Sequence, residues 1–453
     1  MKLLLTNTGG LLSKYGEFQH TLLLSGADIA IVTETKLTVD KCSHSATMIP
    51  EYCGPIRRNR TEHGGGIGVS IKAGIAYQHL DQYQSAEFET AWLTVGQCNS
   101  KTVIGAAYRP GSCADNDLPL LEHLDQNIDT MRQHGKHMIL AGDFIVHSTS
   151  WLGSSRTSIA GEFLEKISAT HCLVQHVTQP TRGPNTLDLL LSDFPGTVHT
   201  AVSCPIGRSD HCVVLSNFQE ITLVLERPTS RKVWRYGQAD WGRLRAHFRS
   251  FDWAAVVCDV PELPCEQLTT VILDGMDTFI PSKTLTVRTT DPCWWTPECS
   301  TVVEAKTRAW KRWRQHPNDG DLRASFIDLV ARTAAILLRA QSSHNARVKA
   351  KLSSGSLNDK QWWSNMKIAA VMERASEIPL LKNIDGTEYP TRQAKANCLA
   401  RYYSQKCSLA DDDMSPDDLP EMQHLDRHGL DRIHFRLSDV RRRLAKLNTS
   451  KAT

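Results

Sequence analysis

Short apolar segments, each ending in a polar or glycine-containing turn, dominate the first half of this 453-residue chain. They are rich in valine, isoleucine and leucine and are bounded by Gly, Asn or Asp, as buried β-strands are. The strands that this pattern predicts cover residues 3–6, 29–33, 67–71, 91–95, 103–108, 138–141, 187–191 and 213–215. Helical patterns lie between some of them, at about 11–25, 117–134 and 159–169, and Ser158 is suited to cap the third. This mixture predicts an α/β domain of packed sheets and helices that ends near residue 220.

The second half of the chain has a different pattern. Segment 233–253 carries aromatic side chains among charged ones, and segment 293–314 holds four tryptophans among lysines and arginines. Small, apolar and basic residues recur at helical spacing from 321 to 352, so a pair of long amphipathic helices is expected. We therefore predict a first domain at 1–220, a linker with short helices at 221–290, a basic, tryptophan-rich helical connector at 291–372 and a further segment at 373–453.

Composition narrows the class of protein only slightly. The hydrophobic fraction of 41% and the charged fraction of 22% are ordinary for a globular protein, and a net charge of +3 identifies no partner. The 13 cysteines are scattered without zinc-type spacing, which favours a reducing compartment, the nucleus or the cytoplasm. The apolar run Leu3-Leu4-Leu5 is too short for a signal peptide, and no run of about 20 apolar residues predicts a membrane helix. The sequence leaves the oligomeric state open.

Acidic and polar residues lie at or just after the ends of the predicted strands. Glu34 comes directly after strand 29–33, Tyr108 ends strand 103–108, and Asp143 follows strand 138–141. Asp188 comes next, and the series closes with Ser209-Asp210-His211. Because strand ends are held by the sheet while they face solvent, functional sites often form there. The series is typical of a metal-dependent phosphodiesterase.

Hydrolysis of a phosphodiester needs neutralised phosphate charge, an activated water and a stabilised leaving oxygen. Glu34 is the leading candidate ligand for Mg²⁺, a cation that prefers hard oxygen ligands, and Mn²⁺ is an alternative. Asp210 is a second candidate ligand, and Asn7 can supply a neutral oxygen to the same cluster. Asp143 is placed to orient or deprotonate the attacking water.

His211 is the candidate for proton transfer or for binding a phosphoryl oxygen. Asp188 can accept a hydrogen bond from His211, which fixes the tautomer of the imidazole and raises its pKa. Each residue alone also has an ordinary interpretation, such as a solvated turn residue or an Asp–His pair on the surface. The order of the motifs and their positions at strand ends favour a site.

Together these motifs resemble the endonuclease/exonuclease/phosphatase family, and more closely the endonuclease domain of LINE-type (non-LTR) retrotransposon proteins of the jockey and chicken-repeat kind. The resemblance covers residues 1–220 and implies a four-layered, DNase I-like α/β sandwich that acts on DNA at one edge of two sheets. The motifs that carry it are Leu5-Thr6-Asn7, Asp28-Ile29-Ala30-Ile31-Val32-Thr33-Glu34-Thr35, Gly64-Gly65-Gly66-Ile67-Gly68-Val69, Ala107-Tyr108-Arg109-Pro110, Leu140-Ala141-Gly142-Asp143-Phe144, Gln179-Pro180-Thr181-Arg182, Thr186-Leu187-Asp188-Leu189 and Ser209-Asp210-His211.

The resemblance assigns a role to each of these residues. It makes Glu34 the main metal ligand with Asn7 beside it, and Asp210 completes the metal cluster. It places Tyr108 on the phosphate, Asp143 at the water and Asp188 beside His211.

The chain departs from the family at Ile145. The family motif is Gly-Asp-Phe-Asn, and its asparagine helps to hold the reacting phosphate, whereas isoleucine has no donor or acceptor. His147 matches a family histidine that follows this position, and we interpret it as a loop residue. Loss of the amide contact predicts weak or absent activity.

The resemblance continues beyond the first domain. Segment 291–372 resembles the connector between endonuclease and reverse transcriptase, and the last residues, Leu447-Asn448-Thr449-Ser450-Lys451-Ala452-Thr453, resemble the first polymerase motif. The chain has no Tyr/Phe-x-Asp-Asp sequence, so no reverse transcriptase activity is expected. The other connector motifs are Val233-Trp234-Arg235-Tyr236, Phe279-Ile280-Pro281-Ser282-Lys283, Trp295-Thr296-Pro297-Glu298, Ile378-Pro379-Leu380 and Asp385-Gly386-Thr387.

Basic residues of the connector have two interpretations. They lie on a solvated helix face, or they contact the phosphates of target DNA or of the element RNA, with an aromatic side chain available for stacking. The candidates for contact with nucleic acid are Arg109, Lys306, Arg308, Lys311, Arg312 and Arg314.

Three hypotheses follow for function. The first is a Mg²⁺-dependent DNA endonuclease that nicks a target for retrotransposition and leaves a 3′-hydroxyl. The second is a catalytically dead remnant that still binds nucleic acid, which Ile145 favours. The third is a phosphatase for a small molecule, which the connector resemblance disfavours.

Overall fold

A computed structural model describes most of the chain. The described residues are 1–38, 47, 49, 52–60, 64–96, 101–111, 113–114, 116–221, 223, 230–253, 262–286, 292–354, 358–369, 381–383, 388–389, 392–407, 438 and 442. The motifs Ile378-Pro379-Leu380, Asp385-Gly386-Thr387 and Leu447–Thr453 lie outside these residues.

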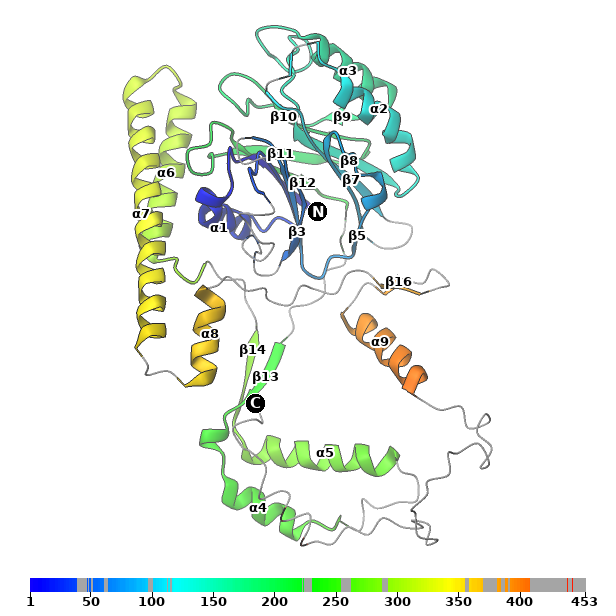
Figure 1. Cartoon of the computed structure of the whole chain (residues 1–453), viewed down its shortest axis with the longest axis vertical. Helices are drawn as coiled ribbons and strands as arrows, with labels where there is room; N and C mark the ends of the chain where they lie inside the picture. Colours follow the sequence, from blue (N-terminus) through cyan, green and yellow to red (C-terminus); the bar gives the residue numbers. More distant parts are fainter. Residues whose placement is uncertain are drawn as a thin grey trace, which may run out of the picture. The chain divides into compact units, whose positions relative to one another are not determined.

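Two six-stranded sheets organise the first half of the chain (Figure 1). The first sheet has the order β11-β12-β1-β2-β4-β3, and the second has the order β5-β6-β7-β8-β10-β9. The first sheet consists of β1 (Lys2–Asn7), β2 (Ile29–Thr33), β3 (Tyr52–Arg58), β4 (Ile67–Lys72), β11 (Val198–Ser203) and β12 (Val213–Phe218). The second consists of β5 (Tyr77–His79), β6 (Glu89–Val95), β7 (Thr102–Tyr108), β8 (His137–Asp143), β9 (Val174–Gln175) and β10 (Asp188–Ser192).

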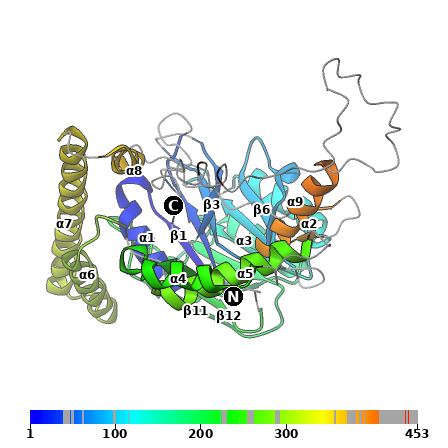
Figure 2. The same cartoon turned by 90° about the horizontal axis from the view of Figure 1, so that it is seen from below.

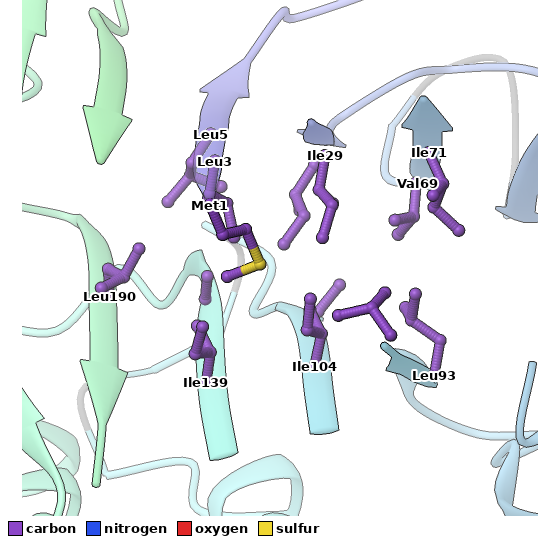
Figure 3. Close-up of a cluster of buried hydrophobic side chains, with 14 of the residues drawn as sticks. Met1, Leu3, Leu5, Ile29, Val69, Ile71, Leu93, Ile104, Ile139 and Leu190 are labelled. Atoms are coloured by element: carbon purple, nitrogen blue, oxygen red, sulfur yellow. The ribbon is translucent and has the colours of Figure 1, made fainter. Parts of the chain in front are cut away.

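The central core lies between the two sheets. Figure 3 shows Leu3, Ile29 and Val69 of the first sheet facing Ile104 and Ile139 of the second. Because successive side chains of a strand point to opposite faces, Leu4 and Ala30 face outward and pack against a helix. Strands that are covered on both faces need apolar residues at every position, which explains the continuous apolar runs of the sequence.

Helices cover the outer faces of both sheets. Helix α1 (Tyr15–Ser25) packs on the first sheet through Phe18 and Leu22. Helices α2 (Pro119–Arg132) and α3 (Ile159–Thr170) cover the second sheet (Figure 1). The hydroxyl of Ser158 accepts a hydrogen bond from the Gly161 N–H at 3.1 Å, so the predicted cap of α3 is confirmed. The layer order of helix, sheet, sheet and helix confirms the predicted four-layered α/β sandwich.

The rest of the described chain is mainly helical. Helices α6 (Pro297–Gln315) and α7 (Gly320–Ser353) lie side by side, as Figures 1 and 2 show. The segment 321–352, for which we expected a pair of helices, is one helix, and its partner α6 precedes it. The remaining elements are η1 (Leu12–Lys14), η3 (Asp81–Tyr83), β13 (Ser230–Trp234), η5 (Tyr236–Gln238), α4 (Trp241–Ser250), α5 (Glu262–Phe279), β14 (Ser282–Thr286), α8 (Asp359–Ala369), β15 (Leu381–Lys382), β16 (Glu388–Tyr389) and α9 (Arg392–Cys407). The chain divides into compact units at Met1–Ala396 and Asn397–Thr453. Among the helices in the described part of the chain, none has the length and apolar character of a membrane span.

Candidate active site

Three neighbouring strand ends of the second sheet bring acidic and polar side chains together. Asp143 ends β8 and is paired in register with Tyr108 of β7 on one side and with Asp188 of β10 on the other. From the first sheet, the Asn7 amide nitrogen donates to Asp143 Oδ2 at 2.8 Å. The Asn7 oxygen accepts from the Gly9 N–H at 2.9 Å, and this contact fixes which end of the amide faces Asp143. Asn7 therefore orients Asp143 across the gap between the sheets.

His211 and Asp188 form a buried pair beside Asp143. His211 Nδ1 lies 2.8 Å from Asp188 Oδ2, and His211 Nε2 lies 3.8 Å from Asp143 Oδ2. Burial lowers the pKa of His211, but the hydrogen bond and charge of Asp188 outweigh burial and raise that pKa to about 9. Burial and the nearby Asp188 carboxylate raise the pKa of Asp143. The imidazole is thus held in one tautomer, with Nδ1–H donating to Asp188.

Two hydroxyl groups that we did not predict hold this pair in place. Thr181 Oγ1 accepts from the main-chain N–H of Leu187 at 3.0 Å and of Asp188 at 3.1 Å. Ser209 Oγ donates to the Asn7 carbonyl at 2.7 Å and accepts from the His211 N–H at 3.2 Å. Both residues belong to the quoted motifs, so their proximity in sequence to Asp188 and His211 was the available signal.

Glu34 is held by Tyr108 on the other side of Asp143. The Tyr108 hydroxyl donates to Glu34 Oε1 at 2.7 Å, while burial and the Glu34 carboxylate raise the pKa of Tyr108. Lys36 Nζ lies 3.9 Å from Glu34 Oε2. The backbone of Glu34 has a φ of 48°, a left-handed conformation that non-glycine residues adopt at a cost and that is frequent at functional sites. The strained turn after β2 therefore directs Glu34 toward the second sheet.

Asp210 occupies a different environment from Asp143 and Asp188. It is exposed, and Arg182 binds its Oδ2 through Nε and a terminal nitrogen, both at 2.7 Å. Burial of the carboxyl raises the pKa of Asp210, but the Arg182 charge outweighs it and lowers that pKa. The described residues whose ligand atoms come within 4.8 Å of one another are Asp143, Asp188 and His211, a group that includes neither Asp210 nor Glu34.

The donor set fits a hard divalent cation. Oδ1 of Asp143 and Oδ1 of Asp188 are buried and have no hydrogen-bond partner in the structure, and a buried carboxylate oxygen without a partner is costly. Carboxylate and amide oxygens suit Mg²⁺.

Ile145 lies in a backbone conformation that suits the missing asparagine. Its φ is 47°, and the end of its side chain lies beside Gly111. The left-handed region is a steric outlier for β-branched residues, whereas asparagine adopts it readily. The Ile145 carbonyl accepts from Arg109 at 3.0 Å, which holds the loop in this conformation. His147 lies in the same loop and its N–H donates to Ser158 Oγ at 3.1 Å.

Two of the cations that we expected to contact nucleic acid are buried in the structure. The Arg109 side chain is 1% exposed, and its guanidinium bonds to the carbonyls of Ile145, Ala114 and Asp117. Lys306 is also 1% exposed and pairs with the Glu17 carboxylate. Both cations are occupied inside the protein, so neither is placed to meet a phosphate.

The other connector cations lie nearer to solvent. Lys311 and Arg312 are exposed, and Arg308 is exposed beside Glu304 at 3.5 Å. Arg314 is half-buried and donates to the Pro180 carbonyl at 2.9 Å.

Replacing Arg109 with methionine is expected to lower the free energy of unfolding by roughly 3 kcal/mol, because three carbonyls lose a charged donor. Chemical denaturation measures the change. Arg208→Met, which removes an exposed arginine, is the control and should stay within about 0.5 kcal/mol of the native value. Equal stability of the two variants would contradict the structural role of Arg109.

One family model matches part of the chain. The family model described as "Endonuclease-reverse transcriptase" matches residues 102–215. This span includes Tyr108, Asp143, Asp188 and His211, whereas Asn7 and Glu34 precede it. No curated protein matches the chain.

Three solved structures are similar to the chain. The endonuclease domain of TRAS1, a telomere-specific non-LTR retrotransposon, is 15% identical over 49% of this chain and 99% of its own, with a TM-score of 0.40. The catalytic domain of Xenopus laevis APE2 is 15% identical over 48% of this chain and 91% of its own, with a TM-score of 0.38. An AP endonuclease from Archaeoglobus fulgidus is 14% identical over 48% of this chain and 99% of its own, with a TM-score of 0.37.

Proposed function

We propose that this chain, in which residues 102–215 match the family model described as "Endonuclease-reverse transcriptase", is a divalent-metal-dependent DNA endonuclease of a retroelement. The observation that carries the proposal is the buried Asp188–His211 pair, joined at 2.8 Å, with His211 Nε2 directed to within 3.8 Å of Asp143. A charged imidazole between two carboxylates at the ends of neighbouring strands can act on a phosphodiester. DNA is the proposed substrate, and the nucleus is the proposed place of action.

The candidate residues divide into two groups. Glu34 and the oxygen of Asn7 are the proposed metal ligands, and Mg²⁺ or Mn²⁺ bound there would neutralise charge on the phosphate. The Asn7 oxygen already accepts the Gly9 N–H, and a carbonyl oxygen has a second lone pair for a cation. We keep Asp210 as a ligand only by resemblance, since Arg182 holds its carboxylate.

Proton transfer and phosphate binding fall to the second group. Asp143 accepts the proton of the attacking water, and Asn7 fixes the orientation of its carboxylate. His211 is an imidazolium at neutral pH, given its raised pKa, and it donates from Nε2 to a phosphoryl oxygen. Asp188 keeps Nδ1 of His211 protonated, and Tyr108 positions Glu34 through its hydroxyl.

The connector is the proposed second contact with nucleic acid. Arg308, Lys311 and Arg312 are exposed on α6 and would meet phosphates of the target DNA or of the element RNA. Such contacts add affinity without sequence preference and weaken as salt rises.

A second candidate function is a catalytically dead remnant that binds nucleic acid. Ile145 favours it, because isoleucine at this position is strained and offers no hydrogen bond to a phosphate. The two candidates share the fold and the exposed cations but differ in turnover.

Removal of the metal should abolish nicking of supercoiled plasmid by the purified full chain carrying Ile145→Asn, because the phosphate charge is then not neutralised. Nicking in Mg²⁺ is measured on agarose gels before and after addition of EDTA, with Mn²⁺ as a second cation. Release of phosphate from a phosphoinositide and from a nucleotide is measured in parallel. Phosphate release without nicking would replace the endonuclease proposal with a small-molecule phosphatase, and nicking that survives EDTA would contradict the metal requirement.

A further inference from the structure

Helix α6 contacts two loops that adjoin the Asp188–His211 pair. Arg314 donates to the carbonyl of Pro180 at 2.9 Å, directly before Thr181. Trp310 packs with Cys204 and Cys212 in one buried cluster, and Cys212 directly follows His211. Helix α6 therefore contacts both loops through Arg314 and Trp310.

A buried ion pair anchors this helix to the first domain. Lys306 binds the Glu17 carboxylate of α1 and donates to the Pro205 carbonyl at 2.8 Å. Both charged side chains are almost fully buried, and separating such a pair would leave an uncompensated buried charge. Trp295, just before α6, also stacks on His20 with ring centroids 4.5 Å apart. The position of α6 on the first domain is thus held by several independent contacts.

Hydrogen bonds connect the two loops to each other. The Thr181 carbonyl accepts from the Cys212 N–H at 2.8 Å, and the Thr181 hydroxyl accepts from the Asp188 N–H at 3.1 Å. Thr181 is therefore bonded to the main chain on both sides of the Asp188–His211 pair. A shift of the loop at Pro180 would change the distance between the carboxylate and the imidazole, and a hydrogen bond weakens steeply with distance and angle.

We propose that α6 is a positioning element of the nuclease site, with Arg314 and Trp310 fixing the loops that hold Asp188 and His211. This inference rests on the proposed function. It makes a segment of the connector a structural part of the endonuclease, since the first 220 residues alone lack the donor to Pro180 and the indole against Cys212. Arg314 acts through the loops and is a positioning residue.

The test uses Arg314→Met in the full chain carrying Ile145→Asn. Methionine keeps an apolar stem but removes the donor to Pro180, so the kcat of plasmid nicking should fall roughly tenfold with little change in KM. Arg314→Lys retains a donor and should recover most of the kcat. Arg323→Met, which removes an exposed arginine of α7, is the matched control and should leave both constants unchanged.

Hydrogen exchange supplies a readout that is independent of activity. The amides of Asp188 and Cys212 should exchange faster in Arg314→Met than in Arg323→Met, because their acceptor Thr181 is less well held. Unchanged exchange in Arg314→Met, or faster exchange with an unchanged kcat, would overturn the positioning role. A rise in KM alone would also overturn it, because that result would indicate a contact with the phosphate. If the Ile145→Asn chain does not nick plasmid, the proposed function is overturned. If that chain nicks plasmid and Arg314→Met does not change its kcat, only this inference is overturned.

Discussion

Replacing Ile145 with asparagine is expected to raise the rate of plasmid nicking in Mg²⁺ by on the order of 10²-fold, because one preorganised donor to the reacting phosphate is restored. The loop is already shaped for the amide. Its φ of 47° is a conformation that asparagine tolerates and isoleucine does not, and Arg109 holds the Ile145 carbonyl in place. DNA affinity should change far less, since phosphate charge dominates binding.

Ile145→Gly separates the amide from the backbone strain. Glycine removes the steric conflict of a β-branched side chain, so both substitutions should raise the free energy of unfolding by about 1 kcal/mol. Only asparagine should accelerate nicking. If glycine accelerates nicking as much as asparagine does, the low rate of the native chain is due to backbone strain. If the native chain nicks plasmid robustly and neither substitution changes its rate, Ile145 is harmless.

Replacing Asp188 with asparagine is expected to lower nicking by the Ile145→Asn chain by about 10²- to 10⁴-fold. The carboxylate accepts the Nδ1–H of His211 at 2.8 Å and raises the pKa of the imidazole to about 9. A neutral amide removes the charge that favours the imidazolium, and it can present an N–H that stabilises the wrong tautomer. Single-turnover nicking measures the loss.

A second Asp–His pair in the same domain provides the control. Asp125 Oδ1 of α2 lies 2.8 Å from Nε2 of His171, the residue that follows α3. Asp125→Asn removes the same charge at the same distance from an imidazole, and nicking should be unchanged. If Asp188→Asn behaves like Asp125→Asn, the role of Asp188 is structural.

The sequence predicted the central strands well and missed the edges. Strands such as β2 and β8 are covered on both faces, so nearly every residue is apolar and the pattern is clear. Within the two six-stranded sheets, the strands that the pattern did not predict are β3, β5, β9 and β11, which form the four edges. Edge strands are partly exposed and bury less apolar surface, so short or mixed segments such as 198–203 carry little signal.

The sequence also predicted some features of the candidate site and missed others. The order of strand-end motifs predicted that Asp143, Asp188 and His211 come together, and the structure places them so. Local sequence could not show that Lys306 is buried, because its partner Glu17 lies on a distant helix. The partners of Arg109 are main-chain carbonyls, which any sequence provides, so they leave no signal in the residue pattern. The pairing of Asp210 with Arg182 is also a contact between distant segments. The catalytic and metal-binding roles of all these residues stay predictions.

The most direct test of the metal-dependent site is nicking by the Ile145→Asn chain with and without Glu34→Gln. Glutamine keeps the size of the side chain and an acceptor for the Tyr108 hydroxyl, but removes the charge that the proposed cation needs. In Mg²⁺, the Ile145→Asn chain should convert supercoiled plasmid into relaxed circles, and the Ile145→Asn, Glu34→Gln chain should leave it supercoiled. Relaxed circles formed equally by both chains, or by neither, would contradict the proposal of a metal-dependent endonuclease centred on Glu34.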